Sequence, residues 1–218
     1  MFATKKGWER HVEIPVGRRK LSGILRVPAG AQGVVAFAHG SGSGRFSPRN
    51  QFVAGSLEKG GLATLLLDLL EEEEATDREK VFNIELLAER LQSAADWLGQ
   101  QPETRALRLG YFGASTGAGA ALVAAARNPK AVSAVVSRGG RPDLAHKILH
   151  VVKAPTLLIV GGNDDVVIEL NEQALRQLRC PKELMIVSGA THLFEEPGAL
   201  EEVSRLASEW FGRHLSPS

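Results

Sequence analysis

The sequence contains the stretch Leu107-Arg-Leu-Gly-Tyr-Phe112, followed at once by Gly113-Ala-Ser115-Thr-Gly117. The first part is a short apolar run of the kind that forms a buried strand, and the second fits the pattern G-x-S-x-G in front of a run of Ala and Gly. Such a sharp turn from strand to helix exposes the Ser115 hydroxyl at a helix N-terminus, where the helix dipole favours negative charge. The stretch predicts a nucleophilic serine; the alternative is a glycine-rich turn whose serine only caps the helix.

Short apolar runs alternate with amphipathic stretches on both sides of this turn. Residues 10–16 and 20–27 predict an antiparallel pair of strands, and six more strands are predicted at 33–39, 62–67, 105–112, 131–137, 155–160 and 183–187. Helices are predicted at 50–59, 83–98, 115–127, 167–178 and 197–211. Repeated strand–helix order implies parallel pairing with right-handed crossovers. The 218 residues therefore predict a single α/β domain, residues 1–218, with a mostly parallel twisted sheet of seven to eight strands flanked by helices on both faces.

Side chains that could activate a serine follow two later strands. A serine nucleophile needs a base, and His192 comes directly after the last predicted strand. The base needs an orienting acid, and Asp164 and Asp165 follow the strand at residues 155–160. The carboxyl ends of parallel strands meet at one edge of a sheet, so these groups are expected to lie together with Ser115. The chain order serine, acid, histidine predicts a catalytic triad, although either aspartate could instead cap the next helix.

An oxyanion hole is expected beside the serine. Backbone N–H groups must face the oxygen that becomes negative, and the residue after the nucleophile, Thr116, supplies one of them. The second is expected from Ser41, in the loop Gly40-Ser-Gly-Ser-Gly44 after the strand that ends at His39. The alternatives for this loop are a flexible connection or a phosphate cradle. A dinucleotide-binding loop is excluded, because Arg45 stands where the third glycine is due.

The composition excludes several other classes of protein. Lys and Arg number 26 against 25 Asp and Glu, so nucleic acid is a poor candidate partner. Cys180 is the one cysteine and cannot form an internal disulfide or, by itself, a zinc site. No apolar run reaches the roughly 18 residues of a membrane span, and residues 1–11 lack the pattern of a secretory signal. A soluble cytoplasmic protein without membrane contact is expected.

Three further features of the sequence lead to separate expectations. His146 and His150 are spaced four apart, but Lys147 takes the place of the glutamate of a zincin, so no metal site is predicted. Residues 71–74, all glutamate, are expected to form a solvated loop. Arg138 and Arg141 follow the strand after the serine, and one of them, assigned as Arg138, could bind a substrate carboxylate. The alternative for these arginines is a structural ion pair with Asp143.

With these motifs in place, the sequence resembles the α/β-hydrolase superfamily and, within it, the dienelactone hydrolase-like branch. The resemblance extends from the His39-Gly40 loop through Gly113-Ala-Ser-Thr-Gly117 and Gly161-Gly-Asn-Asp164 to His192. It implies ester hydrolysis without a cofactor, and it selects Asp164 as the acid, because the family's acid stands three places after the glycine that closes this strand. Ser115 stands where dienelactone hydrolases have cysteine, which favours carboxylesterase chemistry. The short segment 68–83 and the lack of an insertion after Arg138 imply that no large lid is present.

The predicted function is that of a serine carboxylesterase acting on small esters through an acyl-enzyme intermediate. Ser115 attacks the ester carbonyl, His192 moves the proton and Asp164 orients His192. The N–H groups of Thr116 and Ser41 bind the oxyanion. Three alternatives remain at this point: a non-catalytic ligand-binding protein of the same fold, an acyltransferase that uses another acceptor, and a lactone hydrolase of the dienelactone type.

Overall fold

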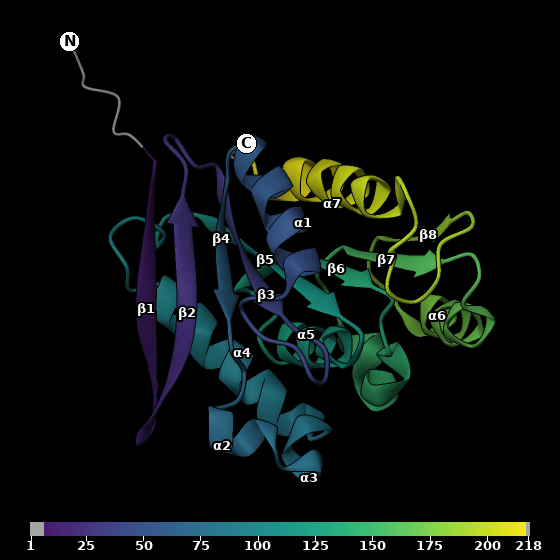
Figure 1. The fold of residues 1–218 in the computed structure, drawn as a ribbon, viewed down its shortest axis with the longest axis horizontal. Helices are drawn as coiled ribbons and strands as arrows, with labels where there is room; N and C mark the ends of the chain where they lie inside the picture. The colour runs from purple at the N-terminus through teal and green to yellow at the C-terminus, as the bar shows by residue number, and fades with distance from the viewer. Residues whose placement is uncertain (1–6, 217–218) are drawn as a thin grey trace.

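The computed structural model describes residues 7–216, in which eight strands form one sheet (Figure 1). The strands are β1 (Trp8–Val16), β2 (Arg19–Val27), β3 (Gly33–Ala38), β4 (Leu62–Leu67), β5 (Arg108–Ala114), β6 (Val132–Arg138), β7 (Thr156–Gly161) and β8 (Lys182–Val187). Their order across the sheet is β1-β2-β4-β3-β5-β6-β7-β8. The β1–β2 and β2–β4 pairs are antiparallel and all the others are parallel. Residues 1–6, which belong to the segment 1–11 that lacks the pattern of a secretory signal, lie outside the described range.

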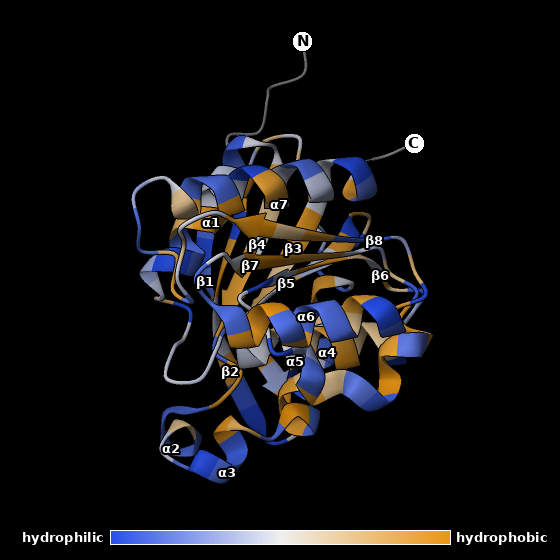
Figure 2. Ribbon diagram, turned by 90° about the vertical axis from the view of Figure 1, so that its right-hand side faces the viewer, coloured by the Kyte–Doolittle hydropathy of each residue, from blue (hydrophilic) through white to orange (hydrophobic). Residues whose placement is uncertain are grey.

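Helices cover both faces of the sheet, as the view in Figure 2 shows. The helices α1 (Pro48–Lys59) and α7 (Ala199–Leu215) lie on one face, and α4 (Ile84–Leu98), α5 (Thr116–Arg127) and α6 (Asp165–Gln177) lie on the other. The short helices α2 (Glu72–Ala75) and α3 (Arg78–Val81) and the 3₁₀ helix η1 (Pro142–Val151) complete the elements. Each face has its own cluster of buried apolar side chains, and β3, β4 and β7 are buried along their whole length. Burial on both faces is what the continuous apolar runs of these strands predict.

The structure confirms the predicted α/β-hydrolase fold, with small shifts in element boundaries. The strand expected from residue 105 begins at Arg108, because the chain is still turning before it: the Leu107 N–H donates to the Thr104 carbonyl at 2.9 Å. The helix expected from residue 50 begins at Pro48, where Ser47 caps it by accepting from the Asn50 N–H at 3.4 Å. No large lid covers the sheet edge within residues 7–216, and none of the helices in that range is long and apolar enough to cross a membrane.

The prediction that residues 71–74 form a solvated loop is wrong. Three of these glutamates belong to helix α2, and Glu74 is only 4% exposed. Its carboxylate accepts two hydrogen bonds from the buried Arg90 of α4, at 2.6 and 2.9 Å, and one from the Glu71 N–H at 3.2 Å. Glu74 is therefore buried although it belongs to an acidic run, because it forms an ion pair with Arg90 on another helix.

Candidate active site

The turn from β5 into α5 holds Ser115 in a strained backbone conformation. Ser115 has φ of 50° and ψ of −120°, a region that residues with side chains rarely adopt. A Cβ on Gly113 would collide with the backbone of Ala118, and a Cβ on Gly117 would collide with the carbonyl of Ala38. Both glycines of the G-x-S-x-G pattern are thus required by the close packing of the turn.

The end of β6 supports this turn through two backbone hydrogen bonds. The Ser115 N–H donates to the carbonyl of Arg138, and the Arg141 N–H donates to the carbonyl of Ser115, each at 3.1 Å. The Ser115 hydroxyl itself has no hydrogen-bond partner among the described residues. The backbone of the serine is therefore fixed from both sides while its hydroxyl is available.

His192 and Asp164 lie together at the same edge of the sheet. The Nδ1 atom of His192 lies 2.7 Å from Oδ2 of Asp164, the residue that caps α6. The loop before His192 is fastened to the loop of the aspartate, because the Asn163 N–H donates to the Ala190 carbonyl at 2.9 Å. Asp165, by contrast, is exposed at the start of α6. The structure thus brings Asp164, and not Asp165, against the histidine.

The histidine lies close to the chain segment that supports the serine. A Cβ on Gly139, next to Arg138, would lie 3.5 Å from Cε1 of His192. The His192 side chain is 38% exposed and the Asp164 side chain 16%, so the carboxylate is the more shielded of the two. No hydrogen bond joins Ser115 to His192 within residues 7–216, and apo catalytic pairs are often long in this way.

The loop after β3 lies directly over the serine. A Cβ on Gly40 would lie 3.1 Å from Cβ of Ser115, which is closer than most real Cβ contacts, so the approach of the loop favours glycine here. The Ser41 N–H donates to the Thr116 hydroxyl oxygen at 3.0 Å. Thr116 is the first residue of α5, so its own N–H has no acceptor within the helix. The two predicted oxyanion donors therefore lie side by side, with the Ser41 N–H at present occupied by the Thr116 hydroxyl.

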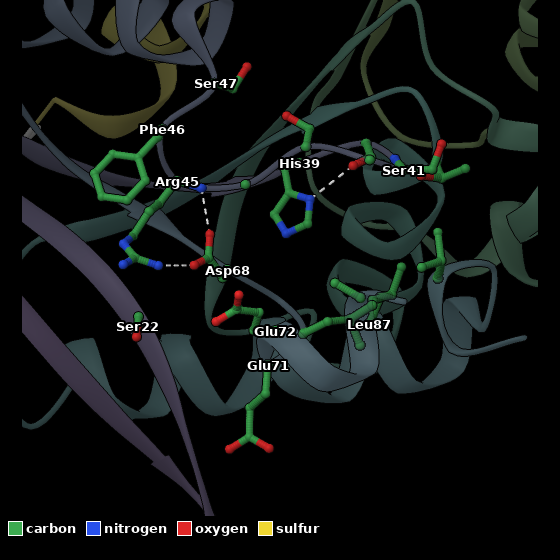
Figure 3. A pocket seen from close by; sticks show the side chains of 18 of the residues that line it. Ser22, His39, Ser41, Arg45, Phe46, Ser47, Asp68, Glu71, Glu72 and Leu87 are labelled. Atoms are coloured by element: carbon green, nitrogen blue, oxygen red, sulfur yellow. Dashed lines mark hydrogen bonds and ion pairs between the residues drawn. The ribbon is translucent and has the colours of Figure 1, made fainter. Parts of the chain in front are cut away.

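His39 orients this loop, a role that the sequence analysis missed. Its ring accepts from the Leu69 N–H through Nε2 at 3.0 Å, so the proton lies on Nδ1, which donates to the Gly40 carbonyl at 2.9 Å (Figure 3). Burial lowers the pKa of His39 and outweighs the opposing effects of Gly40 and Asp68. The Gly40 carbonyl and the Ser41 N–H belong to one planar peptide and point in opposite directions. Fixing the carbonyl therefore fixes the direction of the N–H.

A cavity of about 960 Å³ opens beside this loop. It reaches Ser41 and Thr116 at one end, while Ser115 and His192 lie beyond its lining. Figure 3 shows the Arg45 side chain paired directly with that of Asp68 in the cavity lining, and the Arg45 N–H donates to Asp68 Oδ1 at 2.6 Å. Further walls come from β2 and from α1, α2, α3 and α4. The cavity therefore adjoins the two predicted oxyanion donors.

The two arginines after β6 have different surroundings. Arg141 forms a two-pronged ion pair with Asp143, at 2.8 and 2.7 Å, which is the structural pairing considered from the sequence. Arg138 is 8% exposed and forms no ion pair with the described carboxylates. His146 Nδ1 lies 2.8 Å from the Asp143 carbonyl oxygen, and no metal-binding cluster of three His, Cys, Asp or Glu side chains occurs in the described part of the chain.

A model of the dienelactone hydrolase family matches residues 59–214 of this sequence. The chain belongs to the dienelactone hydrolase family. A solved structure of a dienelactone hydrolase from Anabaena variabilis is similar with a TM-score of 0.93 and 59% identity, covering 96% of this chain and 99% of that chain. The esterase Est1E from Butyrivibrio proteoclasticus has a TM-score of 0.81 at 15% identity, covering 93% and 98%, and so shares the fold.

A second group of relatives is named for a different activity. A Mycobacterium tuberculosis protein named provisionally as a phosphoribosyl transferase is 56% identical over 207 residues, which make up 95% of this chain and 47% of that protein. The chain thus spans about half the length of the curated relatives it matches. The family model and the shared architecture thus agree on the dienelactone hydrolase family, with a fold also found in an esterase.

Proposed function

We propose that this dienelactone hydrolase family member is a serine carboxylesterase. Ser115 attacks the ester carbonyl and forms a bond to its carbon. His192 takes the serine proton and then gives it to the leaving alcohol, which departs from an acyl-enzyme. Water, deprotonated by the same histidine, releases the acid and restores the serine. Asp164 holds the histidine in its working tautomer and stabilises its charged form.

The contact between His192 Nδ1 and Asp164 Oδ2, at 2.7 Å, is the observation that supports this proposal most. It leaves Nε2 as the atom free to accept a proton, which is the arrangement that a general base for a serine requires. The strained conformation of Ser115 supports the same proposal, because strain of this kind gathers at active sites and persists only where the surroundings enforce it.

The oxyanion is bound, in this proposal, by the N–H groups of Ser41 and Thr116. The Thr116 hydroxyl oxygen holds the Ser41 N–H at 3.0 Å before the substrate arrives. A substrate oxygen that becomes negative is a stronger acceptor than a hydroxyl, so it takes over this donor as charge develops. One such donor is worth about 3 kcal/mol of transition-state stabilisation.

Small esters are the proposed substrates, with no cofactor. The cavity of about 960 Å³ is bordered by the Arg45–Asp68 ion pair as well as by apolar groups, which suits a water-soluble molecule better than a long lipid. A lactone is an internal ester and would react in the same way. The name phosphoribosyl transferase belongs to M. tuberculosis relatives of which this chain spans about half, and the groups described here are those of acyl transfer.

A fluorophosphonate probe together with a panel of short esters and lactones tests this function. We expect the probe to label the protein on Ser115 and the protein to hydrolyse at least one short ester. Ser115→Ala should lose both properties, while Ser93→Ala, a serine on the distant helix α4, should keep them. Adding methanol separates hydrolysis from acyl transfer, since a transferase forms mainly the methyl ester. A protein that is neither labelled nor active on any ester would contradict the proposal in favour of a binding role.

A further inference from the structure

Phe194, two residues after His192, is held in a backbone conformation that residues with side chains rarely adopt. Its φ is 57°, and within residues 7–216 the one other non-glycine residue with a positive φ is Ser115. The left-handed region is especially unfavourable for a bulky side chain. Such a conformation persists only where the surroundings enforce it, and it gathers at functional sites. The backbone of Phe194 therefore needs a strong restraint.

The buried ring of Phe194 provides this restraint. The residue is 1% exposed and belongs to the apolar cluster between the sheet and helices α1 and α7. One edge of the ring lies next to the segment after β6, since a Cβ placed on Gly139 would be 3.4 Å from its Cε2 atom. Gly139 is itself fixed to the sheet, because its N–H donates to the Ile159 carbonyl at 2.8 Å. The ring thus holds the chain after His192 beside a fixed point of the sheet.

His192 lies on a tight turn that is fastened before and after the histidine. The Phe194 N–H closes the turn by donating to the Thr191 carbonyl at 3.2 Å. Before the turn, the side-chain amide of Asn163 donates to the Gly189 carbonyl at 2.9 Å. In an extended chain, residues two apart point to the same side. The turn instead lets the imidazole, 38% exposed, face the site while the Phe194 ring enters the core.

The same fixed point supports the serine. Gly139 follows Arg138, whose carbonyl accepts from the Ser115 N–H at 3.1 Å. A Cβ on Gly139 would also lie 3.5 Å from Cε1 of His192. The Phe194 ring, the imidazole and the backbone that holds the serine therefore meet at one glycine.

We propose that Phe194 is a positioning residue that sets the place of His192 relative to Ser115. This proposal rests on the proposed esterase function. The contact with Asp164 holds Nδ1 of the histidine but leaves the ring able to tilt about that bond, so a second restraint is needed to aim Nε2 at the serine. The Phe194 ring supplies it by keeping the turn beside the end of β6. A displacement of about 1 Å in such a site can cost about 100-fold in rate.

The variants Phe194→Met and Phe194→Leu test this role. Both keep an apolar side chain in the core and remove the rigid ring next to Gly139. We expect kcat for p-nitrophenyl butyrate to fall at least about tenfold while KM changes less than about twofold, because the ring orients the base and does not touch the ester. The rate of labelling by a fluorophosphonate should fall by a similar factor, since labelling needs the same activation of Ser115.

Phe211→Met and Phe211→Leu are the matched controls. Phe211 is 0% exposed, belongs to the same apolar cluster and packs on Gly110, five residues before Ser115 along β5. These variants should lose stability but keep kcat and the labelling rate. Equal losses of kcat at the two positions would show a general packing effect and overturn the proposal, as would unchanged kcat in both Phe194 variants.

A nuclear Overhauser measurement separates the positioning of His192 from the esterase function. We expect a signal between the His192 proton on Cε1 and a Gly139 Hα, because the Cβ position of Gly139 lies 3.5 Å from that carbon. The signal should vanish in Phe194→Met and persist in Phe211→Met. If neither Phe194 variant folds, the wild-type signal still decides, since its presence supports the proposed contact and its absence overturns it.

The combined outcomes distinguish the two proposals. A signal that depends on Phe194, in a protein that cleaves no ester and takes no label, would support the positioning role and contradict the esterase function. An active esterase in which Phe194→Met keeps both the signal and kcat would overturn the positioning role and leave the esterase function standing.

Discussion

Ser115 combines a strained backbone with a hydroxyl that has no hydrogen-bond partner among the described residues. Its effect on stability and its effect on catalysis can therefore be measured separately. A residue held at φ of 50° and ψ of −120° costs about 1–3 kcal/mol relative to a relaxed one. The strained conformation persists because β5, β6 and the loop after β3 all contact the turn and hold it in place. A strained serine aimed at open space is an arrangement that packing alone does not explain.

Replacing Ser115 by Ala and, separately, by Gly distinguishes the two effects. We expect both variants to lose several orders of magnitude in ester turnover, because neither has a nucleophile. Ser115→Gly should exceed Ser115→Ala in free energy of unfolding by about 1 kcal/mol, since glycine adopts positive φ without strain. Urea unfolding and ester hydrolysis measure the two effects. Near-full activity of Ser115→Ala would exclude the serine as nucleophile.

The two neighbouring aspartates provide a matched pair of variants. Asp164 contacts His192 at 2.7 Å, whereas Asp165 is exposed at the first turn of α6. Asp164→Asn should lower kcat by about 10⁴, because the histidine loses the partner that fixes its tautomer. Asp165→Asn should leave kcat nearly unchanged and cost at most about 1 kcal/mol of stability from the helix dipole. Equal kcat values for the two variants would contradict the role of Asp164.

The sequence predicts where Ser115, His192 and the pair Asp164 and Asp165 lie, because each follows a strand that is visible as an apolar run, whereas the choice of Asp164 came from the family resemblance. His39 could not be assigned in the same way. Its role depends on the Leu69 N–H, thirty residues further on, and on the direction of one peptide bond. Its position next to Gly40, at the end of a predicted strand, was the one available signal. Local patterns predict where a side chain emerges, but not the distant group it meets.

At the level of elements, α2 is attached to the fold by one buried ion pair. Glu74 and Arg90 are each 4% exposed, and Arg90 also donates to the Leu69 carbonyl at 3.2 Å. The sequence could not show this pairing, because Arg90 lies in a helix whose apolar residues account for the buried face and its partner is sixteen residues away. The acidic run of α2 gives no sign of which glutamate turns inward.

Removing one partner of this pair should be costly. Glu74→Gln leaves the Arg90 charge buried and uncompensated, so we expect the free energy of unfolding to fall by about 3–5 kcal/mol. The double variant Glu74→Leu, Arg90→Met removes both charges and should cost clearly less than Glu74→Gln alone. The exposed pair of Glu202 and Arg205 is the control, and Glu202→Gln should change stability little. A small loss in Glu74→Gln would mean that the pair does not hold α2.

Across the whole molecule, the parallel strands bring the groups of the site to one edge of the sheet, and two of the buried titratable groups there have shifted pKa values. His39 stays neutral because burial lowers its pKa. For Glu74, burial alone would raise the pKa, but hydrogen bonds from Arg90 and the Glu71 N–H, with the charges of Arg90 and Arg19, lower it to about 2. Both shifts make the folded protein bind fewer protons than the unfolded chain, so both predict that the free energy of unfolding decreases as the pH is lowered.

The two groups act in different pH ranges. A histidine in the unfolded chain takes up its proton near pH 6.5. The contribution of His39 to the free energy of unfolding is therefore complete above that pH, and it declines as the pH falls below it, by up to about 1.4 kcal/mol per pH unit. An unfolded glutamate titrates near 4.3, so the contribution of Glu74 is complete above that pH and is lost as pH falls towards 2. Urea unfolding from pH 7.5 to 3 should therefore show two successive declines. His39→Gln should remove the first and Glu74→Gln the second, while His146→Gln, an exposed histidine, should remove neither. A first decline that persists unchanged in His39→Gln would show that this histidine is not held neutral by the fold.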